Sequence, residues 1–157
     1  MRKEIKVKQW KSVDEVLDFA IKNEEEAEAF YIDLSERMDN PAMKTVFTGF
    51  AAEEAGHKAK LLKVKSSGGF EPSKKEVLDL KIGNYLVDVA PEGELSYQDA
   101  LIVAMKKEKA AFKLYMDLHG TVSDPELKDL MLALAQEEAK HKLRFEVEYD
   151  DRYMTQM

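Results

Sequence analysis

The feature that most constrains this chain is an internal repeat with a period of 84 residues. Residues 12–58 align with residues 96–142 without a gap, and seventeen of the aligned positions are identical. Helical periodicity alone produces scattered agreement, but it does not readily produce a gapless match that includes a loop proline and two histidines. The chain is therefore expected to contain two copies of one structural unit.

Each copy is predicted to be a helical hairpin. Apolar and small side chains recur at helical spacing after Ser12 and after Ser96, and the pattern breaks at residues 39–41 and 123–125. Each break ends in a proline, which is favoured in the first turn of a helix and marks where the next helix begins. Because both loops are short, the two helices of each hairpin should run antiparallel.

These elements predict a single all-α domain, a four-helix bundle with one long crossover. Its parts are hairpin one at 12–65, the crossover at 66–95 and hairpin two at 96–150, within residues 1–157. The crossover contains apolar residues, among them Tyr85, that should pack it against the bundle. The end of the chain, from Tyr149, is expected to be a frayed helix end.

Composition excludes several classes of protein. With no cysteine there can be no disulfide, zinc–thiolate site or iron–sulfur cluster, so any metal must be held by carboxylate and imidazole. A net charge of -7 with mixed signs argues against a nucleic-acid partner. No run approaches the ~18 apolar residues that span a bilayer, and the N-terminus lacks the apolar stretch of a signal peptide. A cytoplasmic protein without a membrane partner is expected.

Four glutamates occupy helix positions where the apolar pattern calls for core residues. Glu24 and Glu108 lie seven residues from core positions on either side, and Glu54 and Glu138 each follow an apolar residue by four positions. Helical geometry therefore points all four inward. Burying one isolated carboxylate costs roughly several kcal/mol, and four of them would also repel one another. A pair of metal cations between them would remove both costs.

Two histidines extend this set. His57 and His141 each lie three residues after a glutamate, on the same helix face. One Glu-x-x-His in a Glu-rich helical chain carries little information, but its duplication on core faces favours a two-metal site over a plain bundle with a residual polar core. Carboxylate and imidazole together suit iron or manganese better than magnesium or calcium, and zinc is also compatible.

Two further repeated pairs have alternative interpretations. Tyr31 and Tyr115 lie two turns after the first glutamate of each copy, where they either hydrogen-bond a ligand carboxylate or simply pack in the core. Glu53 and Glu137 lie one position off the ligand face. They are interpreted as surface charge, with contact to a ligand as the alternative.

Residues 12–146 resemble the ferritin and rubrerythrin superfamily, and most of all rubrerythrin-type erythrin domains. The local match is the segment EEEAEAFY at residues 24–31. The resemblance implies a ferritin-like bundle in which two glutamates bridge two metal ions. Two further residues complete the ligand set of each ion. The implied metal ligands are Glu54 and Glu138 as bridges, Glu24 and His57 on one ion, and Glu108 and His141 on the other.

The resemblance also implies a function. Such sites activate dioxygen or peroxide, or oxidise ferrous iron, so the expected protein is a di-iron oxidoreductase of peroxidase or ferroxidase type. Its expected partners are a small oxidant or ferrous ions and a second copy of the chain, as a homodimer or higher homo-oligomer. The alternatives are an iron-handling or storage ferroxidase, and a helical module with a purely structural metal site.

The sequence departs from the rubrerythrin pattern in two ways. Rubrerythrins usually carry a rubredoxin domain that holds iron with four cysteines, and no cysteine is present here. Electrons would then come from an external donor. Rubrerythrins also place an extra glutamate near the third-helix ligand, where this sequence has Ala104, Met105 and Ala111 around Glu108. The predicted site is the symmetric six-ligand type, closer to bacterioferritin, which weakens the case for peroxidase activity.

Overall fold

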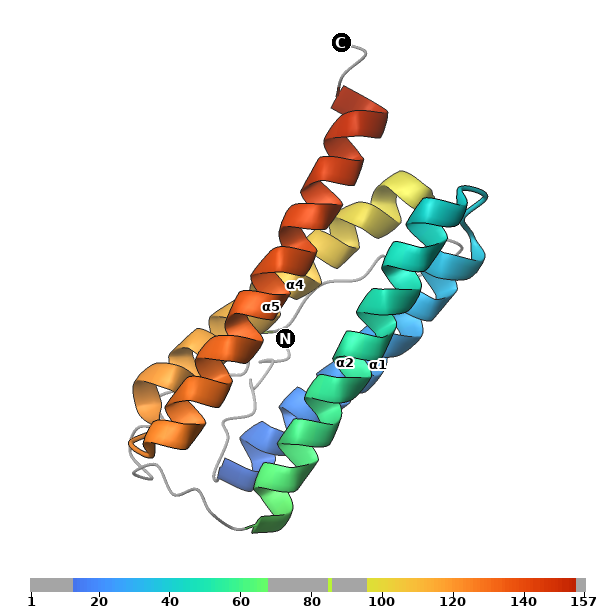
Figure 1. The fold of residues 1–157 in the computed structure, drawn as a ribbon. Coiled ribbons are helices and arrows are strands. Elements are labelled where there is room, and N and C mark those ends of the chain that lie inside the picture. Colours follow the sequence, from blue (N-terminus) through green and yellow to red (C-terminus); the bar gives the residue numbers. More distant parts are fainter. Residues whose placement is uncertain (1–12, 68–84, 86–95, 155–157) are drawn as a thin grey trace, which may run out of the picture.

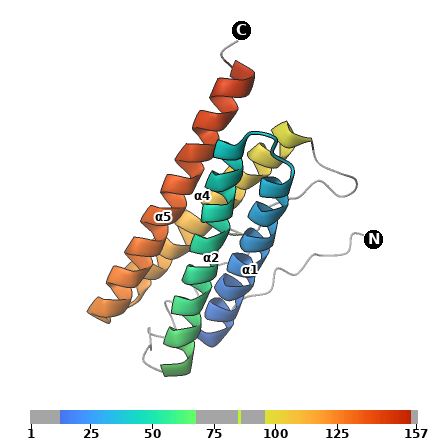
Figure 2. The ribbon, with the colours of Figure 1, turned by 45° about the vertical axis from the view of Figure 1, so that its right-hand side comes forward.

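Four long helices make up most of the computed structural model, which describes residues 13–67, 85 and 96–154. They are α1 (Val13–Glu36), α2 (Pro41–Ser67), α4 (Tyr97–Thr121) and α5 (Pro125–Tyr149), followed by the short π-helix η2 (Asp150–Met154). Helices α1 and α2 form one antiparallel hairpin and α4 and α5 the other, and the two hairpins lie side by side (Figures 1 and 2). The predicted all-α four-helix bundle of two hairpins is confirmed.

The starts of three helices follow from their capping residues. The two loop prolines are the first residues of α2 and α5. The residues before them, Asn40 and Asp124, accept hydrogen bonds from backbone N–H groups two positions on, at 2.9 and 3.0 Å. Ser96 caps α4 by accepting from the Asp99 backbone N–H at 3.1 Å. Ser12, the predicted start of hairpin one, lies outside the described residues.

The core consists of two apolar clusters, one toward each end of the bundle. The first cluster includes Leu17, Leu61, Leu118 and Met131. The second includes Leu34, Phe47, Leu101 and Phe145. In the second cluster the rings of Phe47 and Phe145 stack with centroids 5.6 Å apart. Because every helix contributes to both clusters, the middle turns of all four helices face a layer between them.

The predicted crossover is described only in part. Residues 68–84 and 86–95 lie outside the described residues, and α2 extends through Ser67, two residues beyond the predicted boundary. Tyr85 is buried in the first apolar cluster, and its hydroxyl donates a hydrogen bond to Asp117 at 2.6 Å. At this residue the crossover packs against the bundle as predicted.

The helical backbone continues beyond the predicted end of α5. Instead of fraying after Tyr149, the chain continues as η2 through Met154. Arg152 explains the difference, because its guanidinium contacts Glu148 at 2.9 Å and lies 4.9 Å from the ring centre of Tyr97. The ring of Tyr153 also packs on that of Tyr149. The prediction of a frayed end is therefore wrong for residues 150–154.

None of the helices in the described part of the chain is long and apolar enough to cross a membrane.

Candidate metal centre

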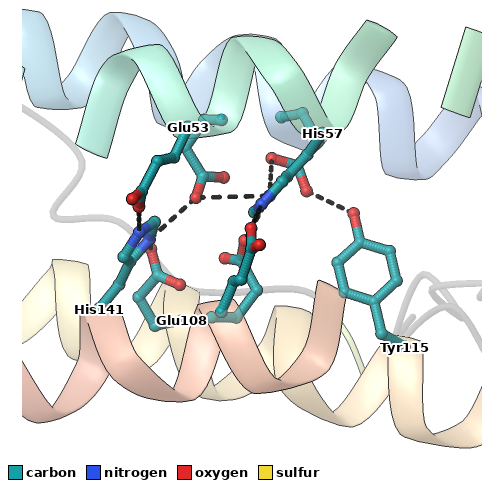
Figure 3. A network of polar contacts seen from close by, with 9 residues as sticks. Glu53, His57, Glu108, Tyr115 and His141 are labelled. Carbon is teal, nitrogen blue, oxygen red and sulfur yellow. Dashed lines mark hydrogen bonds and ion pairs between the residues drawn. The ribbon is translucent and has the colours of Figure 1, made fainter. Parts of the chain in front are cut away.

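Six acidic and imidazole side chains meet in the layer between the two apolar clusters (Figure 3). Each is at most 2% exposed, although its side chain is ionisable. They come from all four helices: Glu24 from α1, Glu54 and His57 from α2, Glu108 from α4, and Glu138 and His141 from α5. The structure thus brings together every residue that the sequence singled out as a ligand.

The six residues form two overlapping groups with the spacing of metal ligands. Within each group, one oxygen or nitrogen atom per residue lies within 4.8 Å of the others. The first group is Glu24, Glu54, His57 and Glu138, and the second is Glu54, Glu108, Glu138 and His141. The groups therefore share Glu54 and Glu138, and each has one further glutamate and one histidine of its own.

The inner nitrogen of each histidine lies between carboxylates of both hairpins. His57 Nδ1 is 2.8 Å from Glu138 Oε1 and 3.5 Å from Glu24 Oε2. His141 Nδ1 is 3.0 Å from Glu54 Oε1 and 3.6 Å from a Glu108 oxygen. The two imidazole rings are nearly parallel, at an angle of 15°. The internal repeat thus appears in the structure as a site with approximate two-fold symmetry.

Every one of the six residues has a buried polar atom that lacks an aligned hydrogen-bond partner. Within the described residues no other side-chain atom is in this state. The atoms are Glu24 Oε2, Glu54 Oε1, His57 Nδ1, Glu108 Oε2, Glu138 Oε1 and His141 Nδ1. Leaving one such atom unsatisfied costs about 1–3 kcal/mol, and more if it is charged. Two cations among these atoms would satisfy all of them, so the residues fit a two-metal site.

Three of the clustered carboxylates have a raised pKa in the metal-free protein. Burial, reinforced by the neighbouring Glu54, raises the pKa of Glu24 to about 8. Burial also raises the pKa of Glu54, and burial together with the charge of Glu108 raises the pKa of Glu138 well above its usual value. Metal ions entering the site must therefore displace protons.

The histidines hold protons strongly for the opposite reason. Burial by itself lowers the pKa of His57, but the carboxylates of Glu138 and Glu24 outweigh it and raise the pKa to about 11. At His141 burial is likewise outweighed, there by Glu108 and Glu54, and the pKa also rises to about 11. In the metal-free protein these imidazolium rings partly balance the buried carboxylates.

The outer nitrogen of each histidine contacts a glutamate of the opposite hairpin. Glu137 contacts His57 Nε2. Glu53 contacts His141 Nε2 (Figure 3). A carboxylate only accepts hydrogen bonds, so Nε2 carries a proton in either charge state of the ring. Once the imidazolium loses its Nδ1 proton to an entering metal ion, the lone pair of Nδ1 faces the cluster. Glu53 is exposed and Glu137 is partly exposed, so their interpretation as surface charge holds, and the alternative of contact with a ligand holds as well.

One of the two repeated tyrosines bonds to a ligand carboxylate and the other packs in the core, so each has one of the two predicted roles. The Tyr115 hydroxyl donates a hydrogen bond to Glu24 Oε1 across the bundle (Figure 3). Tyr31 makes no equivalent bond to Glu108 within the described structure. Its ring instead packs edge-on against that of His141, with centroids 6.1 Å apart, and at a tilt of 32° against that of Phe145, with centroids 5.4 Å apart. The two halves of the site therefore differ in how their first glutamate is held.

A cavity of about 150 Å³ reaches the cluster from the side of α1 and α4. All four candidate glutamate ligands line it, whereas neither histidine does. Its apolar walls include Phe19, Ala27, Ala111 and Leu114, and the exposed Glu26 lies on its rim. A small molecule could thus reach the carboxylate side of the cluster from solvent.

Comparison with known families agrees with this arrangement. The family model named Rubrerythrin matches residues 15–149. The chain belongs to the rubrerythrin family. The match covers all four helices and all six clustered residues. Family membership and the buried Glu/His cluster together fit a site for two metal ions.

Two solved structures share the fold of this rubrerythrin-family chain. A protein from Thermotoga maritima described as ferritin-like and diiron-carboxylate has a TM-score of 0.71 and 24% identity, over 91% of this chain and 97% of the other. A hypothetical protein from Pyrococcus furiosus has a TM-score of 0.67 and 33% identity, over 88% of this chain and 89% of the other. The ferritin-like fold predicted from the sequence is confirmed. No curated protein matches the chain.

The tyrosine difference yields a prediction for this rubrerythrin-family site. Tyr115→Phe is expected to weaken binding of one of two metal ions by about 10-fold, because it removes the hydrogen bond that orients Glu24. Tyr31→Phe, the matched control from the other repeat, should leave both affinities unchanged. Anaerobic competition against a coloured chelator measures both constants. Equal losses in the two variants would contradict an orienting role for Tyr115.

Proposed function

We propose that this protein binds two iron ions and uses them to reduce hydrogen peroxide or dioxygen. The observation that carries the proposal is the set of six buried, unsatisfied donor atoms arranged in two groups that share Glu54 and Glu138. Four carboxylates carry the charge that balances two divalent cations. Glu24 and His57 would hold the first ion, Glu108 and His141 would hold the second, and Glu54 and Glu138, which belong to both groups, would contact both ions.

The choice of iron rests on the mixture of donors. Four carboxylates with two imidazoles suit iron or manganese better than magnesium or calcium, which favour oxygen alone, and zinc is also compatible. The similar protein from Thermotoga maritima is described as a diiron-carboxylate protein, which supports the same choice. Manganese or zinc would be an alternative result of elemental analysis on anaerobically purified protein.

Each part of the site has a distinct role in this proposal. Glu53 and Glu137 orient the histidines, Tyr115 orients Glu24, and the flanking apolar clusters keep bulk water from both ends. The cavity leaves the carboxylate side open to a small oxidant. Two ferrous ions held at this site would supply two electrons, which together with two protons are what the conversion of one hydrogen peroxide into two waters requires.

Returning the site to the ferrous state needs two electrons from elsewhere. This sequence has no cysteine to hold an iron–sulfur or rubredoxin-type centre. We therefore propose an external electron donor.

Rapid mixing of the anaerobically loaded ferrous protein with hydrogen peroxide, and separately with dioxygen, tests the proposal. One equivalent of peroxide should oxidise two irons and produce the near-ultraviolet absorbance of ferric iron. The zinc-loaded protein is the control, because zinc cannot change oxidation state. If neither oxidant changes the spectrum of the iron protein, the redox proposal fails. Oxidation of many more than two ferrous ions per chain would instead indicate iron handling.

A further inference from the structure

We infer that the cavity between α1 and α4 admits the oxidant and that Ala27 and Ala111 limit the size of oxidant it accepts. The inference rests on the proposed function and adds to it a substrate class: hydrogen peroxide and small alkyl hydroperoxides, but not bulky aromatic ones. It comes from the shape of the cavity and the position of these two alanines.

The cavity connects solvent to the carboxylate side of the cluster. The exposed Glu26 and the half-buried Asn23 lie at its outer end, and the four buried glutamates lie at its inner end. Any molecule in the cavity is therefore next to the oxygens that would hold the two ions. Phe19 and Leu114 supply apolar walls between the two ends.

The histidine side of the cluster is covered by protein. Glu137 and Glu53 contact the outer nitrogens of the two rings. The ring of Phe50 also stacks on that of His141, with centroids 4.1 Å apart. A ligand approaching along α2 and α5 would have to displace these contacts, whereas on the side of α1 and α4 the described residues leave a cavity.

Ala27 and Ala111 occupy equivalent positions of the two repeats. Each lies three residues after the glutamate that its helix contributes, on the same helix face and one turn along. Both are half-buried and line the cavity. Next to Glu24 and Glu108 the cavity wall therefore carries only the methyl groups of Ala27 and Ala111. A longer side chain in place of either alanine would extend into the cavity.

The cavity volume sets the size limit. The cavity has a volume of about 150 Å³ and a mixed polar and apolar lining, and a cavity of that volume is large enough for one benzene-sized molecule. Hydrogen peroxide is much smaller, and tert-butyl hydroperoxide is close to benzene in size. Cumene hydroperoxide carries a phenyl ring as well as a branched alkyl group and exceeds the space. Reactivity should therefore fall in that order, with the steepest fall at cumene hydroperoxide.

The test uses Ala111→Leu and Ala27→Leu, which narrow the cavity from opposite walls. Each variant should keep two metal ions, lower the rate with tert-butyl hydroperoxide by roughly 10-fold or more, and affect hydrogen peroxide much less. Azide titration of the ferric protein gives a readout that does not depend on turnover, and its affinity should fall in both variants. Ala133→Leu, at an exposed position of α5, is the matched control.

The outcomes separate this inference from the proposed function. The inference is overturned if both cavity variants keep two metal ions, bind azide as tightly as the wild type and react with alkyl hydroperoxide as fast as the wild type. The proposed function stands in that case. If the wild type reacts with neither peroxide nor dioxygen, the proposed function fails, and azide affinity still decides whether the cavity is the entry. Should one leucine variant lose metal, the other variant and Ala111→Val carry the same comparison.

Discussion

Glu54→Ala and Glu138→Ala are each expected to abolish binding of both metal ions, whereas Glu24→Ala weakens only one. The reason is that both ligand groups include Glu54 and Glu138, while Glu24 belongs to the first group alone. Removing a residue that only hydrogen-bonds to a metal ligand typically lowers metal affinity by about 10–100-fold. Removing a ligand that both ions share should therefore lower the affinity for each ion by more than roughly 100-fold. Elemental analysis after anaerobic loading and desalting measures the metal content.

Matched variants make this comparison decisive. Glu54→Gln preserves the size of the side chain, so a loss of metal in that variant cannot be ascribed to a cavity left by alanine. Glu36→Ala, at an exposed position near the end of α1, controls for the loss of a surface charge. Circular dichroism establishes that each variant is helical. Retention of one tightly bound ion by both Glu54→Ala and Glu138→Ala would contradict the shared role of these glutamates.

Metal loading is expected to raise the melting temperature by roughly 10 °C. An ion present at 1,000 times its Kd stabilises the folded state by about 4 kcal/mol, which for a chain of this length corresponds to about 8–16 °C. Thermal melts with chelator and with Mn²⁺, followed by circular dichroism, measure the shift. A melting temperature that is the same with and without metal would contradict a two-metal site in the bundle core.

The rise in melting temperature on metal loading should be larger at pH 8 than at pH 6. In the metal-free protein the pKa values of His57 and His141 are raised to about 11, so the stability that their protons contribute is fully present below the ordinary value near 6.5 and is lost as the pH rises toward 11. The pKa of Glu24 is raised from 4.5 to about 8, so the stability that its proton contributes to the metal-free protein is lost as the pH rises from 4.5 to 8. Metal binds more tightly over the same range, because it competes with these protons.

The parts of the site that are fixed by helical geometry could be predicted from the sequence. The inward positions of Glu24, Glu54, Glu108 and Glu138 follow from their spacing to core residues on the same helix. That spacing is independent of how the hairpins pack. The helix starts at Pro41 and Pro125 are equally local, since they depend on loop chemistry alone.

Contacts between the hairpins could not be predicted in the same way. Glu53 and Glu137 lie one position off the ligand face, yet each is long enough to reach a histidine on the opposite hairpin once the hairpins are packed. Their repetition directly before the ligand glutamates was the available signal. The signal was insufficient because spacing along one helix says nothing about a neighbouring helix.

The difference between the two tyrosines has a similar origin. Tyr31 packs among aromatic rings that include Phe50 and Phe145. At the repeat-equivalent positions the sequence has Leu134 and Leu61, and these lie in the same apolar cluster as Tyr115. Identical residues in the two repeats therefore have different neighbours, and only one of them bonds to a carboxylate.

The even division of the ligands between the two hairpins bears on how such a protein could arise. Each hairpin contributes two glutamates and one histidine, which is half of the cluster. Two identical hairpins related by a two-fold axis would present the same six ligands. A short ancestral peptide that paired with itself could therefore have bound two ions before its gene was duplicated. Fusion of the copies would then have allowed Tyr31 and Tyr115 to diverge in role.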